Sequence, residues 1–241
     1  MGDVHSNLQA VRDRIDEACR LAGRDPAQVR LLPVSKTHGL GPIREAYDAG
    51  YHRMGENRVQ EALDKWERTR DWPGIEWAVI GHLQTNKARE VARFAVEFQA
   101  LDSLKVAREL EKRLQAEGRA LDVLVQVNSS AEPQKSGLDP ADVPAFAEQL
   151  RPFDSLRVRG LMTLAVRSAD RTQVAACFER MRDLQEVLRQ DDRAAGSYDE
   201  LSMGMSGDLD LAVAHGSTCV RVGRAIFGER TDRNAYWKTV E

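Results

Sequence analysis

The strongest constraint on the fold is a regular alternation of short apolar runs with longer stretches of helical spacing. Residues 123–127 are almost continuously apolar, which is typical of a parallel strand covered by helices on both faces. Residues 103–116 and 170–189 instead repeat apolar side chains at helical intervals, with polar residues on the opposite face. We predict strands at residues 31–35, 51–54, 76–80, 97–101, 122–128, 157–162, 200–203 and 218–222.

Eight β/α units in 241 residues predict an α/β protein with one domain, a single (β/α)8 TIM barrel over residues 1–241. An extra amino-terminal helix is predicted at residues 7–22, and Ser6 with Gln9 predicts a capping box at its start. We expect this helix to close the bottom of the barrel. A doubly wound open sheet is the alternative, but no G-x-G-x-x-G pattern follows the first strand.

Composition limits the partners. The 35 Lys and Arg residues nearly balance 38 Asp and Glu residues, for a net charge of −3, which argues against nucleic acid as the main partner. The three cysteines are far apart and form no C-x-x-C pair, so neither a disulfide framework nor a metal site is predicted. Residues 1–10 are polar where a signal peptide would be apolar, and no run approaches a membrane span. We therefore expect a cytoplasmic protein that does not bind membranes.

Barrel enzymes and binding proteins carry their chemistry in the loops at the carboxyl ends of the strands. Lys36 follows the first strand, where a rigid, partly desolvated amine could form imines, although position alone favours an ordinary surface lysine. Asn57 follows the second strand and either lines a pocket or favours a turn. His82 follows the third strand and is either an acid or base or a structural residue. Glu56 and Glu61 have no other metal ligands near them in sequence.

The last two predicted loops suggest an anion site. Residues 204–208 form a small-residue loop before a helical stretch at 209–214, Ser206 adds a hydroxyl, and Gly223 follows the eighth strand. Many barrels bind phosphate between these two loops, although an N-cap and ordinary turn glycines would give the same pattern. Arg221 lies within an apolar strand, so its guanidinium needs a partner, either a structural ion pair or a ligand.

These residues lie in segments that together resemble the pyridoxal phosphate homeostasis protein family of the YggS/PROSC type. The family shares the barrel of the amino-terminal domain of alanine racemase. The matching segments follow one another along nearly the whole chain, which makes the resemblance specific. They are LLPVSKTH (31–38), GENRVQEALDK (55–65), IGHLQTNK (80–87), VLVQVNSSAEPQKSGL (123–138), RGLMTLA (159–165), LSMGMSGDLDLAVAHGST (201–218) and VRVGRAIFG (220–228).

The resemblance implies pyridoxal 5'-phosphate (PLP) as the cofactor. Lys36 matches the lysine that holds PLP covalently as an internal aldimine, and Asn57 matches the asparagine of the G-E-N motif in the pocket. Ser206 and Gly223 match the phosphate cradle, and Arg221 matches the arginine that faces the pyridine nitrogen. An arginine there should keep that nitrogen unprotonated and so weaken the ring as an electron sink. No catalytic residue is assigned.

The function that the resemblance implies is PLP binding for intracellular vitamin B6 homeostasis, without catalytic turnover. We expect a monomer that supplies PLP to client enzymes. One alternative is a PLP-dependent amino-acid racemase, but this needs a second base. None of Tyr47, Tyr51, Tyr198 and Tyr236 falls in a predicted carboxyl-end loop, and the chain ends soon after its eighth strand. Another alternative is a phosphosugar enzyme, such as an aldolase, that uses a Schiff-base lysine.

Three positions depart from the family pattern. His38 stands where many members have lysine, Arg58 where tyrosine is frequent, and His82 where proline is frequent. We expect all three near the mouth of the pocket, where they would alter access of the cofactor. Lys135 matches the K-S-G segment, but no role follows for it.

Overall fold

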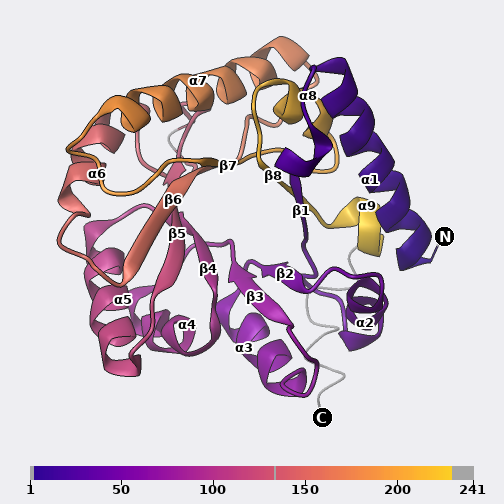
Figure 1. The fold of residues 1–241 in the computed structure, drawn as a ribbon, viewed down its shortest axis with the longest axis horizontal. Helices are drawn as coiled ribbons and strands as arrows, with labels where there is room; N and C mark the ends of the chain where they lie inside the picture. Colours follow the sequence, from indigo (N-terminus) through magenta and orange to yellow (C-terminus); the bar gives the residue numbers. More distant parts are fainter. Residues whose placement is uncertain (1–2, 133, 230–241) are drawn as a thin grey trace.

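In the computed structural model, residues 3–132 and 134–229 are described, and their strands form one parallel sheet. The strand order is β1-β8-β7-β6-β5-β4-β3-β2, so the sheet winds round once in sequence order. Figure 1 shows the strands at the centre with the helices outside them. The strands are β1 (Arg30–Pro33), β2 (Arg53–Glu56), β3 (Glu76–Val79), β4 (Glu97–Leu101), β5 (Leu121–Val127), β6 (Leu156–Thr163), β7 (Glu200–Ser202) and β8 (Cys219–Val222).

The two edges of the sheet meet between β1 and β2. A parallel bridge joins Val34 to Gly55, and the Ser35 backbone N–H donates to the Gly55 carbonyl at 3.1 Å. A Cβ on Gly55 would lie 3.2 Å from the Leu32 side chain, so a larger residue would crowd the neighbouring strand. The predicted barrel is therefore confirmed, and the open doubly wound sheet is wrong.

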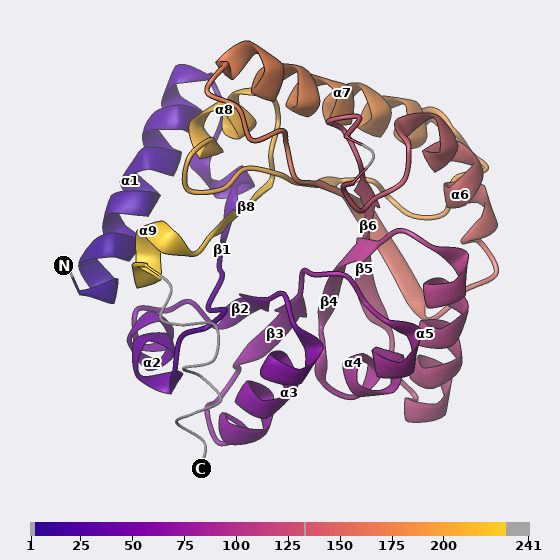
Figure 2. The same ribbon diagram turned by 180° about the vertical axis from the view of Figure 1, so that it is seen from behind.

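Helices follow the strands along the chain and cover the outside of the barrel (Figures 1 and 2). Helices α5 and α7 each bury one apolar face, and they begin with the side chains of Ser103 and Asp170 as N-caps. Three short 3-10 helices are Pro26–Gln28, Thr85–Lys87 and Pro140–Asp142. The α-helices are α1 (Val4–Leu21), α2 (Leu40–Asp48), α3 (Val59–Arg68), α4 (Ala88–Phe94), α5 (Leu104–Glu117), α6 (Val143–Gln149), α7 (Arg171–Gln190), α8 (Leu209–Ala214) and α9 (Arg224–Phe227).

Two local predictions were wrong. Helix α1 begins three residues earlier than predicted and has no capping box at Ser6; instead the Asp3 side chain caps it and accepts from the Ser6 N–H at 2.7 Å. Strand β2 lies two residues later than predicted, so that Gly55 and Glu56 belong to the strand and not to the loop. Apolar content alone could not place this strand, because its last residue is a buried glutamate.

Helix α1 does not close the bottom of the barrel, as we expected. It packs against α8, α9 and α2 in the outer ring of helices, as Figures 1 and 2 show. The reason is that α9, which follows β8, has only four residues and is too short to cover β8 and β1. Helix α1 takes this place and buries Leu8, Val11, Ile15 and Cys19. Within the described residues, no helix is long and apolar enough to cross a membrane.

The position of α1 can be tested by truncating its buried face. Ile15 is fully buried, so Ile15→Ala should lower the free energy of unfolding by about 2–5 kcal/mol. Leu21 ends the same helix with 72% of its surface exposed, and Leu21→Ala should change stability by less than about 0.5 kcal/mol. Urea unfolding of both variants measures this difference. Equal effects would show that α1 is not part of the core.

Candidate functional site

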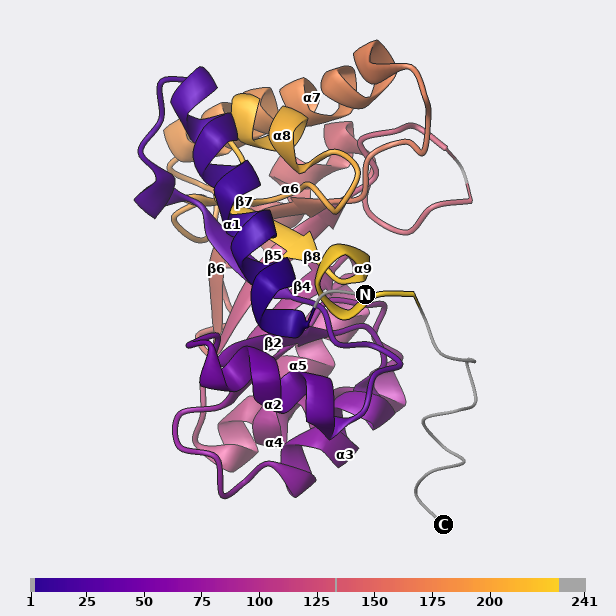
Figure 3. The ribbon, with the colours of Figure 1, turned by 90° about the vertical axis from the view of Figure 1, so that its right-hand side faces the viewer.

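A cavity of about 600 Å³ opens at the carboxyl ends of the strands. Its volume lies within the range of about 300–1,000 Å³ that is usual for small-molecule sites. Figure 3 shows α9 and the long loops after β5 and β6 on one side of the barrel. The structure brings all five predicted site residues to this cavity: its lining includes Lys36, Asn57, Ser206, Arg221 and Gly223.

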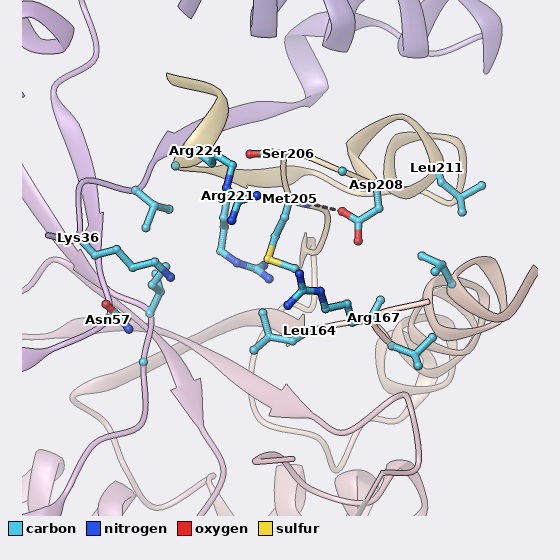
Figure 4. A pocket seen from close by; sticks show the side chains of 18 of the residues that line it. Lys36, Asn57, Leu164, Arg167, Met205, Ser206, Asp208, Leu211, Arg221 and Arg224 are labelled. Carbon is cyan, nitrogen blue, oxygen red and sulfur yellow. Dashed lines mark hydrogen bonds between the residues drawn. The ribbon is translucent and has the colours of Figure 1, made fainter. Parts of the chain in front are cut away.

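Lys36 and Asn57 form one wall of the cavity. Figure 4 shows the Lys36 side chain entering from the β1 side, with Asn57 beside it. The backbone of Asn57 is approached closely by Gly81, because a Cβ on Gly81 would lie 2.1 Å from the Asn57 carbonyl oxygen. Only glycine allows this packing of the loops after β2 and β3. The two side chains are thus held on loops that the barrel places together.

Arg221 is 4% exposed and lies at the floor of the cavity. Its Nη1 donates to the Ser202 hydroxyl at 2.6 Å, and its Nη2 donates to the Thr163 carbonyl at 2.7 Å. Both acceptors are neutral, and no carboxylate in the described ranges forms an ion pair with Arg221. Burial lowers the pKa of the guanidinium, but an arginine stays protonated in proteins. The cavity therefore has a fixed positive charge, and a structural ion pair is not what holds it.

A buried polar chain continues from Arg221 through the barrel. The Ser202 hydroxyl donates to Gln99 Oε1 at 2.7 Å, and the Gln99 amide donates to Glu97. Glu97 forms ion pairs with Arg53 at 2.8 Å and with Arg30 at 3.0 Å. Glu97, Arg53 and Arg30 are the first residues of β4, β2 and β1. The series of polar side chains therefore links the cavity to the amino ends of the strands. No local motif predicted it, because its members come from five strands.

Ser206 and Gly223 meet where β8 leads into α9. The Ala225 N–H donates to the Ser206 hydroxyl at 3.4 Å. A Cβ on Gly223 would lie 2.9 Å from the Val34 carbonyl oxygen, so glycine is needed for β8 to pass the end of β1. The Met205 N–H donates to Asp208 at 2.6 Å and orders the preceding loop. The loops after β7 and β8 thus present a hydroxyl and small residues to the cavity, as predicted.

A cluster of buried charges lies behind the Lys36 loop. Lys65 is fully buried, and its Nζ lies 2.5 Å from Glu56 Oε1 and 2.8 Å from Glu61 Oε1. Burial raises the pKa of Glu56 to about 7, against the opposing effect of Lys65. The sequence showed the two glutamates but not their lysine partner. The i,i+4 spacing of Glu61 and Lys65 on α3 was the sequence feature that could have indicated this ion pair.

The three departures from the family pattern occupy different positions. His38 lines the cavity and is buried, with its ring 5.5 Å from that of Phe227. Burial lowers the pKa of His38, which favours the neutral imidazole. Arg58 and His82 are exposed and do not line the cavity, although each follows a residue that does, Asn57 and Gly81. Lys135 donates to the Ala165 carbonyl at 3.1 Å.

The loop after β6 is the part of the cavity that sequence reasoning missed. Leu164, Arg167 and Ser168 line the cavity from this loop, and Figure 4 shows Arg167 reaching towards its centre. The loop follows a predicted strand, as the other lining loops do, and this position could have indicated that it lines the cavity. With Arg171 and Arg224 it gives the lining an excess of cations. No group of three His, Cys, Asp or Glu residues suited to a metal occurs in the parts of the chain that are described.

Comparison with known proteins gives a consistent result. The family described as "Alanine racemase, N-terminal domain" matches residues 6–231. A pyridoxal phosphate homeostasis protein of Pseudomonas aeruginosa is 43% identical over 230 residues, which cover 95% of this chain and 97% of that protein.

Solved structures agree with the sequence match. PipY of Synechococcus elongatus, with PLP bound, has a TM-score of 0.82 and 36% identity, and covers 93% of this chain and 100% of its own. Alanine racemase of Streptomyces coelicolor has a TM-score of 0.74 at 20% identity, over 94% of this chain and 58% of that one, and shows the shared fold. The chain therefore belongs to the pyridoxal phosphate homeostasis protein family, with the barrel of the amino-terminal domain of alanine racemase.

Proposed function

We propose that this protein binds PLP in the cavity and holds it for vitamin B6 homeostasis without catalytic turnover. The observation that carries the proposal is the convergence of Lys36, Asn57, Ser206, Arg221 and Gly223 on one cavity in a chain whose relative PipY was solved with PLP bound. The proposal includes a single barrel domain over residues 1–241, a monomer in the cytoplasm, and release of PLP to client enzymes.

The chemistry of the cavity fits PLP. A phosphate monoester carries a charge of about −1.5 to −2 at neutral pH. The lining offers Arg167, Arg221 and Arg224 against one carboxylate, Asp208, while the fourth arginine, Arg171, forms an ion pair with Asp210 at 2.6 Å. The loops after β7 and β8 supply Ser206 and Gly223 where barrels commonly bind phosphate. A lysine amine on the opposite side of the cavity suits the aldehyde.

Each residue then has a distinct task in the proposed complex. Lys36 would hold PLP through its amine, which suits an aldehyde and would release one water molecule on forming a C=N bond. Asn57 lines the pocket beside this lysine, while Ser206 and the backbone at Gly223 receive the phosphate. By the resemblance, Arg221 would face the ring nitrogen and would disfavour its protonation. PLP itself supplies an electron sink, which an unprotonated ring nitrogen weakens.

The positions of the tyrosines favour holding the cofactor over racemisation. Racemisation needs a second base on the face of the substrate opposite the lysine. Tyr47 donates to the Pro73 carbonyl at 2.7 Å, Tyr198 is fully buried, and Tyr51 precedes β2. None of these three lines the cavity, and Tyr236 lies outside the described residues. The phosphosugar alternative has no observation of its own in support.

The covalent anchor can be identified by borohydride reduction after addition of PLP, followed by peptide mass mapping. Borohydride reduces the C=N bond, so the pyridoxyl phosphate mass should appear on the peptide that contains Lys36. The matched variant Lys36→Arg should lose this adduct and the absorbance of the C=N bond, whereas Lys112→Arg, which changes an exposed lysine on α5, should keep both. A main adduct on another lysine in the unaltered protein would contradict the proposal.

Absence of turnover is tested separately by exchange of the α-proton. The PLP-loaded protein, incubated with L-alanine in D2O, should give deuterium incorporation and D-alanine no faster than free PLP at the same concentration. The physical reason is that no tyrosine lines the described part of the cavity to act as a second base. Exchange at least a hundredfold above free PLP would favour the racemase.

A further inference from the structure

We infer that the buried Glu56–Lys65–Glu61 cluster is a clamp that holds the Lys36 backbone in a strained turn and so positions the amine in the cavity. Glu61 and Lys65 are positioning residues in this inference, because they act through the turn at residues 35–38. The inference rests on the proposed function of Lys36 and adds to it the means by which the lysine is held.

The clamp grips the chain on both sides of Lys36. Before it, the Ser35 carbonyl accepts from Lys65 Nζ at 2.9 Å, and the Ser35 hydroxyl donates to Glu56 Oε1 at 2.6 Å. After it, the Thr37 N–H donates to Glu61 Oε1 at 2.6 Å. A single buried ion cluster therefore fixes the peptide groups that flank Lys36.

The turn needs such support, because its backbone is unfavourable. Thr37 has a φ of 68°, which lies in the left-handed region. A β-branched residue is rarely found there, and such a conformation persists only where the surroundings impose it. The His38 N–H closes the turn on the Ser35 carbonyl at 3.0 Å. The hydrogen bond from Thr37 to Glu61 comes from the strained residue itself.

The cluster is suited to this task because all its charges are buried together. Lys65 and Glu56 are fully buried, and Glu61 is 2% exposed. Transferring an ion from water to the protein interior is unfavourable unless an opposite charge lies close to it. Lys65 and the two carboxylates are therefore held in contact, and their side chains have little conformational freedom. Strand β2 and helix α3 carry these three residues, which ties the Lys36 turn to two elements of the barrel.

The first experiment removes the acceptor and then relieves the strain. Glu61→Ala should lower the affinity for PLP, measured from the absorbance of the C=N bond, at least tenfold. Glycine adopts a positive φ without strain, so Thr37→Gly in the Glu61→Ala background should recover at least half of this loss on a logarithmic scale. Glu61→Gln keeps a carbonyl oxygen for the Thr37 N–H and should stay within about threefold of the unaltered protein.

Glu111 provides a matched control. It is a buried glutamate on α5 that accepts from the Ser155 backbone N–H at 3.0 Å, just as Glu61 accepts from Thr37. Glu111→Ala should lower the urea midpoint of unfolding about as much as Glu61→Ala while leaving PLP affinity within twofold. The clamp is refuted if Glu61→Ala binds PLP within twofold of the unaltered protein, or if Thr37→Gly restores nothing.

A measurement on the unaltered protein keeps the inference testable if Glu61→Ala does not fold. Hydrogen exchange of the Thr37 amide, in the absence of PLP, should be slowed at least a hundredfold relative to an unstructured peptide. Exchange at the unstructured rate would refute the clamp. If the unaltered protein forms no C=N bond with PLP, the proposed function fails and this inference fails with it. If the bond forms but Glu61→Ala has no effect, only the clamp fails.

Discussion

The geometry of the site depends on how the charges of buried side chains in the barrel are balanced. Two buried cations lie close to the cavity, and they are balanced in opposite ways. Lys65 is surrounded by two carboxylates and a carbonyl, whereas Arg221 is held by a hydroxyl and a carbonyl. The charge of Lys65 is therefore neutralised locally and serves to fix geometry. The charge of Arg221 is not neutralised by a hydrogen-bonded carboxylate, so its field is available to a ligand.

Lys65 therefore helps to shape the site, whereas Arg221 is placed to interact with a ligand in the cavity. A guanidinium at the floor of a cavity with no hydrogen-bonded carboxylate is unfavourable without a partner. The neutral Ser202 and Gln99 side chains connect Arg221 to Glu97 by hydrogen bonds, and the charges of Asp208 and Glu97 act on it from further away. The Glu97 carboxylate is itself neutralised by Arg30 and Arg53. An anionic ligand would complete the balance at the cavity end.

Sequence patterns predicted what depends on local spacing. Strand β4 and helix α8 were both placed with their exact bounds, and small residues precede α8. The misplacement of α1 shows the limit: the helix is amphipathic in either position, and only the shortness of α9 decides where it packs.

The candidate site divides in the same manner. Lys36, Asn57, Ser206, Arg221 and Gly223 each follow or end a strand, so the barrel rule brought them to one cavity, while their roles came from the resemblance. Lys65 lies inside a helix and becomes a neighbour of Ser35 only when α3 packs on the barrel. The hydrogen-bonded series from Arg221 to Glu97 joins residues more than a hundred positions apart in the sequence. Contacts of this kind arise from tertiary structure, and no pattern along the chain encodes them.

The shared fold with alanine racemase does not decide between holding a cofactor and using it. Two-base racemisation through a carbanion needs an electron sink, a base on each face of the substrate and room for the substrate. The cavity has the room and one amine, but the described tyrosines face other parts of the molecule. In the proposed complex, Arg221 would also oppose protonation of the ring. A cavity with no tyrosine among its described lining residues would keep the aldehyde chemistry of PLP and disfavour racemisation, as the proposed storage and delivery of PLP require.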